Sequence, residues 1–303
     1  MNGLRSNTST RACGDRYVLP VPRACCFGRP YVAKESQRGY LKKDDQFLQI
    51  ASIVGGTLGS PLPGKELLGM SPNREAPDSP PATYVLIHGA GDVGWYWHLV
   101  EPELRRRGHD VVVMDLPVDD DSAGLSTYAD VVVDAIGDRD HLVLVAQSFA
   151  GYVAPMVCER LPVALLVLVA GMVPSPGESA EQMFANTGYA NEAHGDPSDV
   201  VGTFYQDVEP TLAAEAVARG GRRQSETPSK EPWPLPAWPD VPTRYLLCRQ
   251  DRLFPAAWVR RVVRDRLGIT PDEMDSGHTP ALSHPKELVE RLETYRADVW
   301  ETV

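Results

Sequence analysis

A serine, an aspartate and a histidine stand far apart in this chain of 303 residues, in an order suited to nucleophilic catalysis. They are Ser148, Asp251 and His278, and each lies in a short segment that follows an apolar run. A serine hydroxyl becomes a nucleophile when a nearby base takes its proton, and an acid must hold that base in the right tautomer. Brought together, the three side chains could perform acyl transfer.

The candidate nucleophile lies in the segment AQSFAG (146–151), directly after an apolar run. A strand that turns sharply into a helix would expose the Ser148 hydroxyl. The strained turn requires small neighbours, which Ala146 and Ala150 supply. Glycine is usual at both flanking positions, so the two alanines depart from the pattern. The alternative is a serine that merely caps the helix.

The candidate base is His278, in the segment SGHTP, which follows another short apolar segment. The chain order of serine, acid and histidine is the order found in hydrolases whose nucleophile sits on a sharp turn between strand and helix. His284 is the rival base. Because it precedes Pro285, where the last helix is expected to begin, we favour His278.

The candidate acid is Asp251, in the segment CRQDRLFP (248–255), on a loop after an apolar run that is expected to be a strand. A carboxylate here could accept a hydrogen bond from the histidine and fix its tautomer. The competing interpretation is an exposed loop aspartate that pairs with Arg249 or Arg252.

A glycine-bearing turn, HGAG (88–91), follows the first apolar run. Ester cleavage passes through a tetrahedral oxyanion, and each well-placed backbone N–H donor stabilises that oxyanion by about 3–4 kcal/mol. The predicted donors are the N–H groups of Ala90 and of Phe149, the residue after the candidate nucleophile. We expect His88 to have a structural role.

Five apolar runs alternate with segments of helical periodicity from residue 84 onward, and a sixth, shorter run precedes His278. The runs are continuous, which is typical of strands buried on both faces. This alternation predicts an α/β fold with a doubly wound, mostly parallel sheet of about six strands. We expect Ser126 to cap the first long helix. The runs are 84–88, 111–115, 142–146, 164–170 and 245–248, and helices are expected over 126–136, 153–161 and 288–299.

Composition divides the chain into two parts. Residues 1–80 carry 11 Lys/Arg against 7 Asp/Glu, which leaves 19 against 34 for the remainder. We predict that residues 1–81 are a low-order extension with a Pro-rich linker and that residues 82–303 form the catalytic domain. An organelle transit peptide is the alternative for the first thirty residues, although their prolines interrupt an amphipathic helix.

Within the predicted catalytic domain, the segment at about 172–241 has little strand character and reads as a helical cap over the site. Such caps supply apolar pockets with few polar groups. The candidate substrate contacts are Trp97, Phe184 and Tyr205, with core packing as the alternative for Trp97. An irregular surface insertion is the competing interpretation of the whole segment.

The net charge of −11 and the pI near 5.1 disfavour a nucleic-acid binder. The chain has no run of 18 apolar residues that could span a membrane. The five cysteines lack the spacing of a metal site or a disulfide scaffold, and the acidic run Asp119–Asp121 is read as solvated. We therefore predict a cytoplasmic protein that uses neither a metal nor a cofactor, with a homodimer as an option.

Four segments together resemble the α/β-hydrolase superfamily, and within it the branch of plant-type methylesterases and hydroxynitrile lyases with its bacterial esterase relatives. They are HGAGDVGWYW (88–97), AQSFAG (146–151), CRQDRLFP (248–255) and SGHTPALSHP (276–285). The resemblance covers about residues 82–300. It implies an esterase that cleaves a small carboxylic ester through an acyl-enzyme on Ser148, His278 and Asp251.

Two other functions remain open. In the plant lyases of this branch, a threonine follows the histidine of the first motif and a lysine follows the catalytic histidine. Gly89 and Thr279 occupy those positions here, so hydrolysis is favoured over cyanohydrin cleavage. The third option is a non-catalytic ligand-binding protein that keeps the hydrolase fold.

Overall fold

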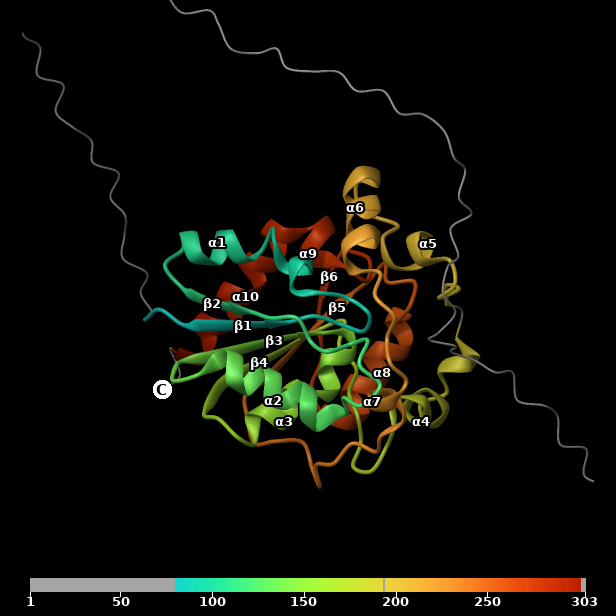
Figure 1. Ribbon diagram of the computed structural model, residues 1–303, viewed down its shortest axis with the longest axis horizontal. Helices are drawn as coiled ribbons and strands as arrows, with labels where there is room; N and C mark the ends of the chain where they lie inside the picture. The colour runs from blue at the N-terminus through green and yellow to red at the C-terminus, as the bar shows by residue number, and fades with distance from the viewer. Residues whose placement is uncertain (1–79, 193, 301–303) are drawn as a thin grey trace, which may run out of the picture.

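The computed structural model describes residues 80–192 and 194–300 (Figure 1). Their strands form one parallel sheet in the order β2-β1-β3-β4-β5-β6. This confirms the predicted parallel sheet of about six strands. The strands are β1 (Thr83–Ile87), β2 (Asp110–Val113), β3 (Leu142–Gln147), β4 (Val163–Val169), β5 (Thr243–Cys248) and β6 (Asp272–Met274).

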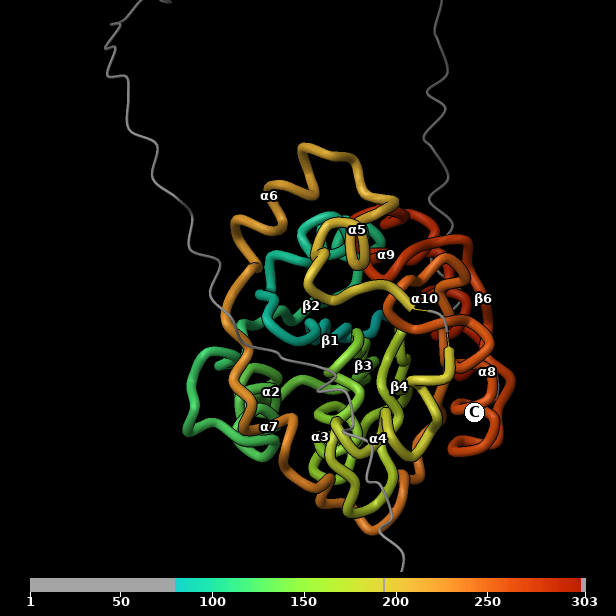
Figure 2. Tube along the Cα trace, turned by 90° about the vertical axis from the view of Figure 1, so that its right-hand side faces the viewer, coloured from blue at the N-terminus to red at the C-terminus, as the bar shows by residue number. Residues whose placement is uncertain are grey.

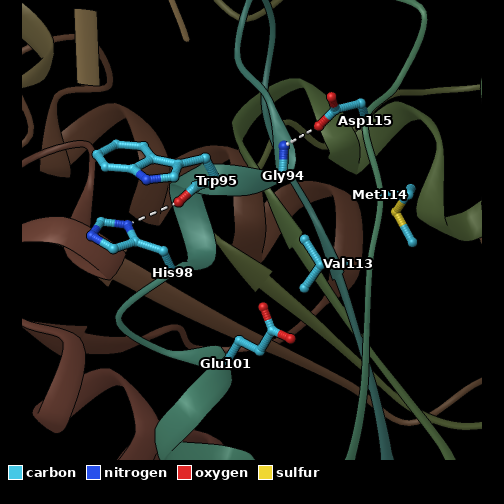
Figure 3. A pocket seen from close by; sticks show the side chains of 7 residues that line it. All are labelled: Gly94, Trp95, His98, Glu101, Val113, Met114 and Asp115. Carbon is cyan, nitrogen blue, oxygen red and sulfur yellow. Dashed lines mark hydrogen bonds between the residues drawn. The ribbon is translucent and has the colours of Figure 1, made fainter. Parts of the chain in front are cut away.

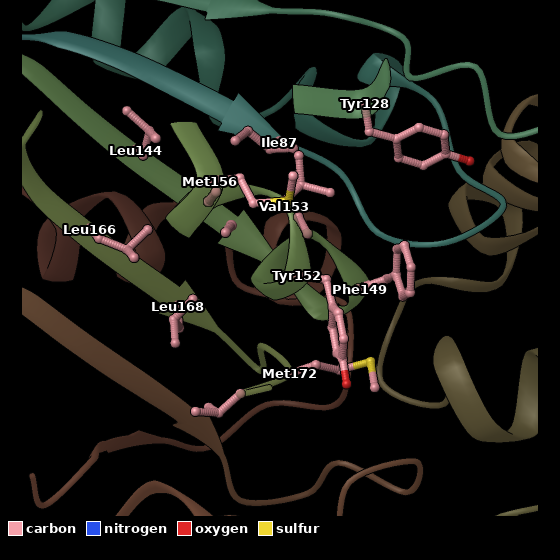
Figure 4. Packing of buried hydrophobic residues seen from close by; sticks show 14 of the residues in the cluster. Ile87, Tyr128, Leu144, Phe149, Tyr152, Val153, Met156, Leu166, Leu168 and Met172 are labelled. Atoms are coloured by element: carbon pink, nitrogen blue, oxygen red, sulfur yellow. The ribbon is translucent and has the colours of Figure 1, made fainter. Parts of the chain in front are cut away.

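Alternate residues of the central strands enter two separate cores. In β1, Val85 and Ile87 belong to the cluster on one face of the sheet, and Tyr84 and Leu86 belong to the cluster on the other face. All four side chains are fully buried. Burial on both faces explains why the strands are continuous apolar runs in the sequence. Figure 4 shows the first cluster, in which Ile87, Leu144 and Leu166 point from neighbouring strands toward the same layer.

Helices cover both faces of the sheet, as in a doubly wound fold (Figure 1). Buried residues of α2, α3 and α8 complete the first cluster, whereas those of α1, α9 and α10 complete the second. These helices are α1 (Glu101–Arg106), α2 (Leu125–Ile136), α3 (Ala154–Cys158), α8 (Ala256–Leu267), α9 (Pro280–Ser283) and α10 (Pro285–Trp300), with short 3₁₀ helices η1 (Gly94–Trp97) and η2 (Ser148–Tyr152).

One local prediction was wrong, and one helix is shorter than predicted. Ser126 does not cap α2: it lies inside the helix, and Gly124 precedes the first helical residue without a side-chain cap. The Leu125 N–H donates instead to Glu231 Oε2 at 2.7 Å, so a distant carboxylate satisfies the helix start. The helix expected over 153–161 is present as α3, which covers only Ala154–Cys158 and directly follows the 3₁₀ helix η2.

Between β4 and β5 the chain forms short helices at the end of the sheet where the strands terminate (Figures 1 and 2). They are α4 (Ala180–Asn186), η3 (Tyr189–Asn191), α5 (Val200–Phe204), α6 (Pro210–Gly220) and α7 (Thr227–Lys230). We refer to residues 172–241 as the insertion. The carboxyl ends of parallel strands are where such folds place their sites, so the insertion is well placed to contact one.

The predicted extension, residues 1–81, falls almost entirely outside the described residues, and the domain boundaries stay a prediction. Over residues 80–192 and 194–300, no helix has the length and apolarity needed to cross a membrane.

Candidate active site

Ser148 begins a tight turn at the end of β3. Its φ is +52°, in the left-handed region that non-glycine residues rarely adopt, and η2 starts at this residue. Met172 donates its N–H to the Ser148 carbonyl at 2.9 Å. A Cβ added to Gly151 would lie 2.0 Å from the Met172 carbonyl oxygen, so only glycine fits there. The close approach of these backbones holds the serine in a strained conformation.

A chain of hydrogen bonds links the three residues predicted from the sequence. Ser148 Oγ lies 3.0 Å from His278 Nε2, and His278 Nδ1 lies 2.7 Å from Asp251 Oδ2. A carboxylate only accepts, so Nδ1 carries the proton and Nε2 is free to accept the serine proton. The exposed fractions are 8% for Ser148, 2% for His278 and 7% for Asp251. In this shielded setting the hydrogen bonds are stronger than they would be in water.

The second oxygen of Asp251 is held by its own loop. Oδ1 accepts the backbone N–H groups of Leu253 at 2.7 Å and Phe254 at 2.9 Å. Both oxygens of the buried carboxylate are therefore satisfied, and its orientation toward the histidine is fixed. The exposed ion pair considered for Asp251 is wrong, because Arg249 pairs with Asp275 and Arg252 donates to a backbone carbonyl.

Two phenyl rings stand nearly perpendicular to the His278 imidazole. The Phe254 centroid is 5.1 Å away at an interplanar angle of 86°, and the Phe204 centroid is 5.5 Å away at 74°. The Thr279 hydroxyl also donates to the Phe204 carbonyl at 2.7 Å. Because Phe204 ends α5, the insertion packs directly on the histidine.

Sequence reasoning missed two polar residues that hold the histidine loop. Gln147 Nε2 donates to the His278 carbonyl at 3.1 Å, and Asp207 Oδ2 accepts the Gly277 N–H at 2.6 Å. The sequence did offer a clue to Gln147, because this polar residue follows the apolar run 142–146 and directly precedes the candidate nucleophile. Asp207, in a polar stretch of the insertion, carried none.

The turn after β1 lies directly against Ser148. A Cβ on Gly89 would come within 2.3 Å of Gln147 Oε1 and 3.0 Å of Ser148 Cβ, so a larger residue here would displace the Gln147 amide. Ala90 follows, and its N–H was predicted, with that of Phe149, to bind an oxyanion. Ala90 is thus the neighbour of the glycine that approaches Ser148, and Phe149 is the residue after Ser148 in the chain. Their role as oxyanion donors stays a prediction.

His88 holds the same turn in place. Its Nδ1–H donates to the Gly89 carbonyl at 2.8 Å, and its Nε2 accepts the Leu116 N–H at 3.0 Å. Burial lowers the pKa of His88 to about 4. The ring is therefore neutral near pH 7 with the proton on Nδ1, and its two contacts fit the structural role expected from the sequence.

The predicted substrate contacts lie in different surroundings. Trp97 is fully buried in the second core cluster with its ring edge-on to Tyr96, which favours the packing alternative, and its substrate contact stays a prediction. Phe184 packs on the first cluster. Its ring centroid lies 4.7 Å from that of Tyr189 and 6.2 Å from that of Phe254, which itself contacts His278. Tyr205 is half-buried beside the second cluster. Substrate contacts of Phe184 and Tyr205 stay predictions.

A surface hollow of about 350 Å³ lies beside η1, apart from the three candidate catalytic residues (Figure 3). In it, the Trp95 and His98 rings stack at 4.0 Å, and Asp115 Oδ1 accepts the Gly94 N–H at 2.7 Å. Its lining contains none of Ser148, His278 and Asp251. The residues that line it are Gly94, Trp95, His98, Glu101, Val113, Met114 and Asp115.

The acidic run Asp119–Asp121 is engaged by arginines and a serine. Asp119 pairs with Arg222, Asp121 pairs with Arg223, and Asp120 accepts from the Ser122 hydroxyl. In the part of the chain that the structure describes, no three His, Cys, Asp or Glu side chains are grouped to hold a metal ion.

Comparison with known proteins gives relatives that match over nearly their whole length and over about 70% of this chain. Methylesterase 9 from Arabidopsis thaliana is 24% identical over 247 residues, covering 69% of this chain and 96% of the relative. Norfluorocurarine synthase 1 from a Strychnos species is 22% identical over 249 residues, covering 69% and 93%. The crystal structure of a pyrethroid hydrolase from Sphingobium faniae superposes with a TM-score of 0.61 at 21% identity, covering 72% of this chain and 98% of that one.

The sequence profile of the alpha/beta hydrolase family matches residues 84–291. The match spans the parallel sheet from β1 to β6 and the loops that carry Ser148, Asp251 and His278. It confirms the resemblance drawn from the sequence, and it covers more than two thirds of the chain. The chain belongs to the alpha/beta hydrolase family.

Proposed function

We propose that the chain is a serine hydrolase that cleaves small carboxylic esters through an acyl-enzyme. The observation that supports it most strongly is the aligned series Ser148 Oγ, His278 Nε2, His278 Nδ1 and Asp251 Oδ2, with separations of 3.0 Å and 2.7 Å between residues. Nucleophile and base are within hydrogen-bond reach, and a third group orients the base.

In the first half-reaction, His278 Nε2 takes the proton of Ser148 as Oγ attacks the ester carbonyl carbon. The carbonyl π-electrons move to oxygen, and the N–H groups of Ala90 and Phe149 stabilise the resulting oxyanion. The Asp251 carboxylate faces the imidazolium that forms. The tetrahedral species then collapses, the bond to the leaving oxygen breaks, and His278 gives its proton to the departing alcohol.

In the second half-reaction, water replaces the alcohol. His278 takes a proton from the water as its oxygen attacks the acyl carbon, and the same two N–H groups hold the second oxyanion. Collapse breaks the bond to Ser148 Oγ, which recovers its proton from His278, and the carboxylic acid leaves. No cofactor enters this sequence of steps.

Features of the site and the names of the relatives support a small ester as the substrate. Methylesterase 9 is named for methyl esters, and the pyrethroid hydrolase for hydrolysis of pyrethroids. The triad residues are nearly enclosed, with Ser148 only 8% exposed, which favours a compact ester. Against cyanohydrin cleavage, Thr279 uses its hydroxyl to bind the Phe204 carbonyl, and no lysine stands at that position.

The test compares the wild-type chain with Ser148→Ala on p-nitrophenyl acetate and a panel of methyl esters. We expect turnover to fall by about four orders of magnitude or more, because the nucleophile is removed. A fluorophosphonate probe should label the wild type and leave Ser148→Ala unlabelled. Ser126→Ala, an exposed serine on α2, is the matched control and should retain both activity and labelling.

Three outcomes would contradict the proposal. Retained turnover in Ser148→Ala would remove the serine from the mechanism. A wild type that neither labels nor turns over any ester would favour the ligand-binding alternative. Release of cyanide from a cyanohydrin without ester turnover would favour the lyase.

A further inference from the structure

The last part of the insertion binds the turn that carries Ala90. Gly91 donates its N–H to Gln224 Oε1 at 2.9 Å, and the Arg222 N–H donates to the Gly91 carbonyl at 3.1 Å. A Cβ on Gly91 would lie 3.0 Å from the Arg222 carbonyl, and its φ of +66° also favours glycine. Both backbone polar groups of Gly91 are thus engaged by residues more than 130 positions away.

The Gln224 side chain has one possible orientation. It is 7% exposed, and its Nε2 donates to the Tyr128 hydroxyl at 3.2 Å and to the Ser225 carbonyl at 3.0 Å. The Gly91 N–H is a donor only, so the amide oxygen must face it and the amide nitrogen must face the other two. The amide is therefore fixed at both ends.

The segment that carries Gln224 is also attached on its other side. The Ser225 N–H donates to the Val118 carbonyl at 2.6 Å. Arg222 and Arg223 form ion pairs with Asp119 and Asp121 at 2.8 Å and 2.7 Å. These ion pairs are partly exposed, so each contributes little on its own. The buried Gln224 amide is the contact that reaches the turn.

We propose that Gln224 is a positioning residue for the oxyanion turn. By holding the Gly91 N–H, it fixes the peptide plane between Ala90 and Gly91 and, through it, the backbone of Ala90. An oxyanion donor works only when it is held in advance at the position where the charge develops. The inference rests on the proposed function and assigns to it a residue that acts through its contact with Gly91.

The effect of losing this contact should appear in kcat and hardly in KM. The donors interact more strongly with the oxyanion than with the ground-state carbonyl, so a misplaced donor costs transition-state binding selectively. A residue that only stabilises the fold would lower the melting temperature without this selectivity.

The test variant is Gln224→Met, which keeps the length of the side chain and removes its hydrogen bonds. We expect kcat on p-nitrophenyl acetate to fall about 10- to 100-fold, with KM within about twofold of the wild type. The affinity for an aryl trifluoromethyl ketone, which forms an oxyanion adduct with the serine, should fall in parallel.

Three variants serve as controls. Gln224→Glu keeps an acceptor for the Gly91 N–H and should retain more kcat than Gln224→Met. Tyr128→Phe removes one partner of the amide nitrogen and keeps the contact to Gly91, so kcat should stay within about threefold. Arg223→Ala breaks an exposed ion pair of the same segment and should stay within about twofold.

A folded Gln224→Met variant with wild-type kcat and wild-type affinity for the ketone would overturn the role of Gln224. Where that variant does not fold, Gln224→Asn, which withdraws the amide by one methylene, is measured in the same way, and unchanged kcat there overturns it equally. A wild type that lacks ester turnover and probe labelling would overturn the hydrolase proposal itself, which separates the two failures.

Discussion

Met172 donates its backbone N–H to the carbonyl oxygen of Ser148 at 2.9 Å, between the segments that follow β3 and β4. The same Met172 backbone lies so close to Gly151 that a Cβ there would meet its carbonyl oxygen at 2.0 Å. The positive φ of Ser148 costs about 1–3 kcal/mol and is kept because these contacts leave the turn no other conformation.

Gly151→Ala should therefore harm both stability and activity. The added methyl group meets backbone atoms, which cannot move aside as a flexible side chain would. We expect a loss of about 3 kcal/mol in the free energy of unfolding and a large loss of turnover. Urea unfolding and hydrolysis of p-nitrophenyl acetate measure the two.

Gly177→Ala is the matched control. Gly177 has a φ of +73° and nothing within 4 Å of an added Cβ, so the cost should be the backbone strain alone, about 1 kcal/mol, with turnover kept. Equal losses of stability and activity in the two variants would show that the contact with Met172 does not govern the turn.

Asp251→Asn should leave a folded protein with little activity. The amide oxygen can still accept from Leu253 and Phe254, but the amide NH₂ faces His278 Nδ1 and favours the tautomer that protonates Nε2. We expect kcat to fall by about 10³- to 10⁴-fold with a small change in melting temperature. Asp275→Asn, which loses an exposed pair with Arg249, should keep its activity. Similar kinetics in both variants would argue against Asp251 as the orienting acid.

The buried His88 predicts a loss of stability in mild acid. Because its folded pKa of about 4 is below the unfolded value of 6.5, the unfolded chain binds the proton first as the pH falls. The free energy of unfolding should drop by roughly 3 kcal/mol between pH 6.5 and pH 4 from this residue. No such loss from it occurs above pH 6.5.

Urea unfolding of the wild type and of His88→Gln at pH 7, 5.5 and 4.5 tests this. The variant should be less stable at pH 7 and should show a shallower decrease with acid. His141→Gln, a half-exposed histidine, should follow the wild type at each pH. Parallel pH profiles for the wild type and His88→Gln would contradict the assignment.

Asp92 should affect the pH dependence of the free energy of unfolding in the opposite direction to His88. Burial raises the pKa of Asp92 to about 6, despite the hydrogen bond from the Val93 N–H, which lowers it. Above pH 6 the folded protein must keep a charged carboxylate in a partly desolvated place. Asp92→Asn, which retains the acceptor for Val93, should therefore raise the free energy of unfolding at pH 8 by on the order of 1–2 kcal/mol.

That advantage should shrink as the pH falls through 6 and should be gone near pH 4, where Asp92 is neutral in the folded protein and is becoming neutral in the unfolded chain. Asp140→Asn, at a side chain that is 87% exposed, should show no such trend. Thermal unfolding at pH 8 and pH 5 gives the comparison. A constant difference at both values would mean that the carboxylate is not desolvated.

The parts of the fold that follow from local pattern could be predicted from the sequence. The strands of Tyr84, Leu144 and Leu246 are continuous apolar runs because both of their faces are buried, and that pattern is visible without a structure. The candidate residues Ser148, Asp251 and His278 could also be found from the sequence, because each follows an apolar run that forms a strand.

What depends on distant contacts could not be predicted. Ser126 has the residue type of a helix cap, but Glu231 takes that role from more than 100 residues away. For Trp97 the sequence allowed both a substrate contact and core packing, and only the structure shows that its ring is fully buried in a core cluster. Gln224 lies in a polar stretch with no periodicity, so nothing local distinguishes it from an exposed glutamine.

The insertion contacts the candidate active site at two separate points. Asp207 accepts a hydrogen bond from Gly277 in the loop of His278, and Gln224 accepts one from Gly91 in the turn after β1. A chimera that transplants this segment between relatives to change substrate preference would exchange both supports together with the pocket. Such a chimera would also need the loops around residues 91 and 277 that match the transplanted segment. Without them, we expect the hybrid to change its substrate contacts and to lose kcat.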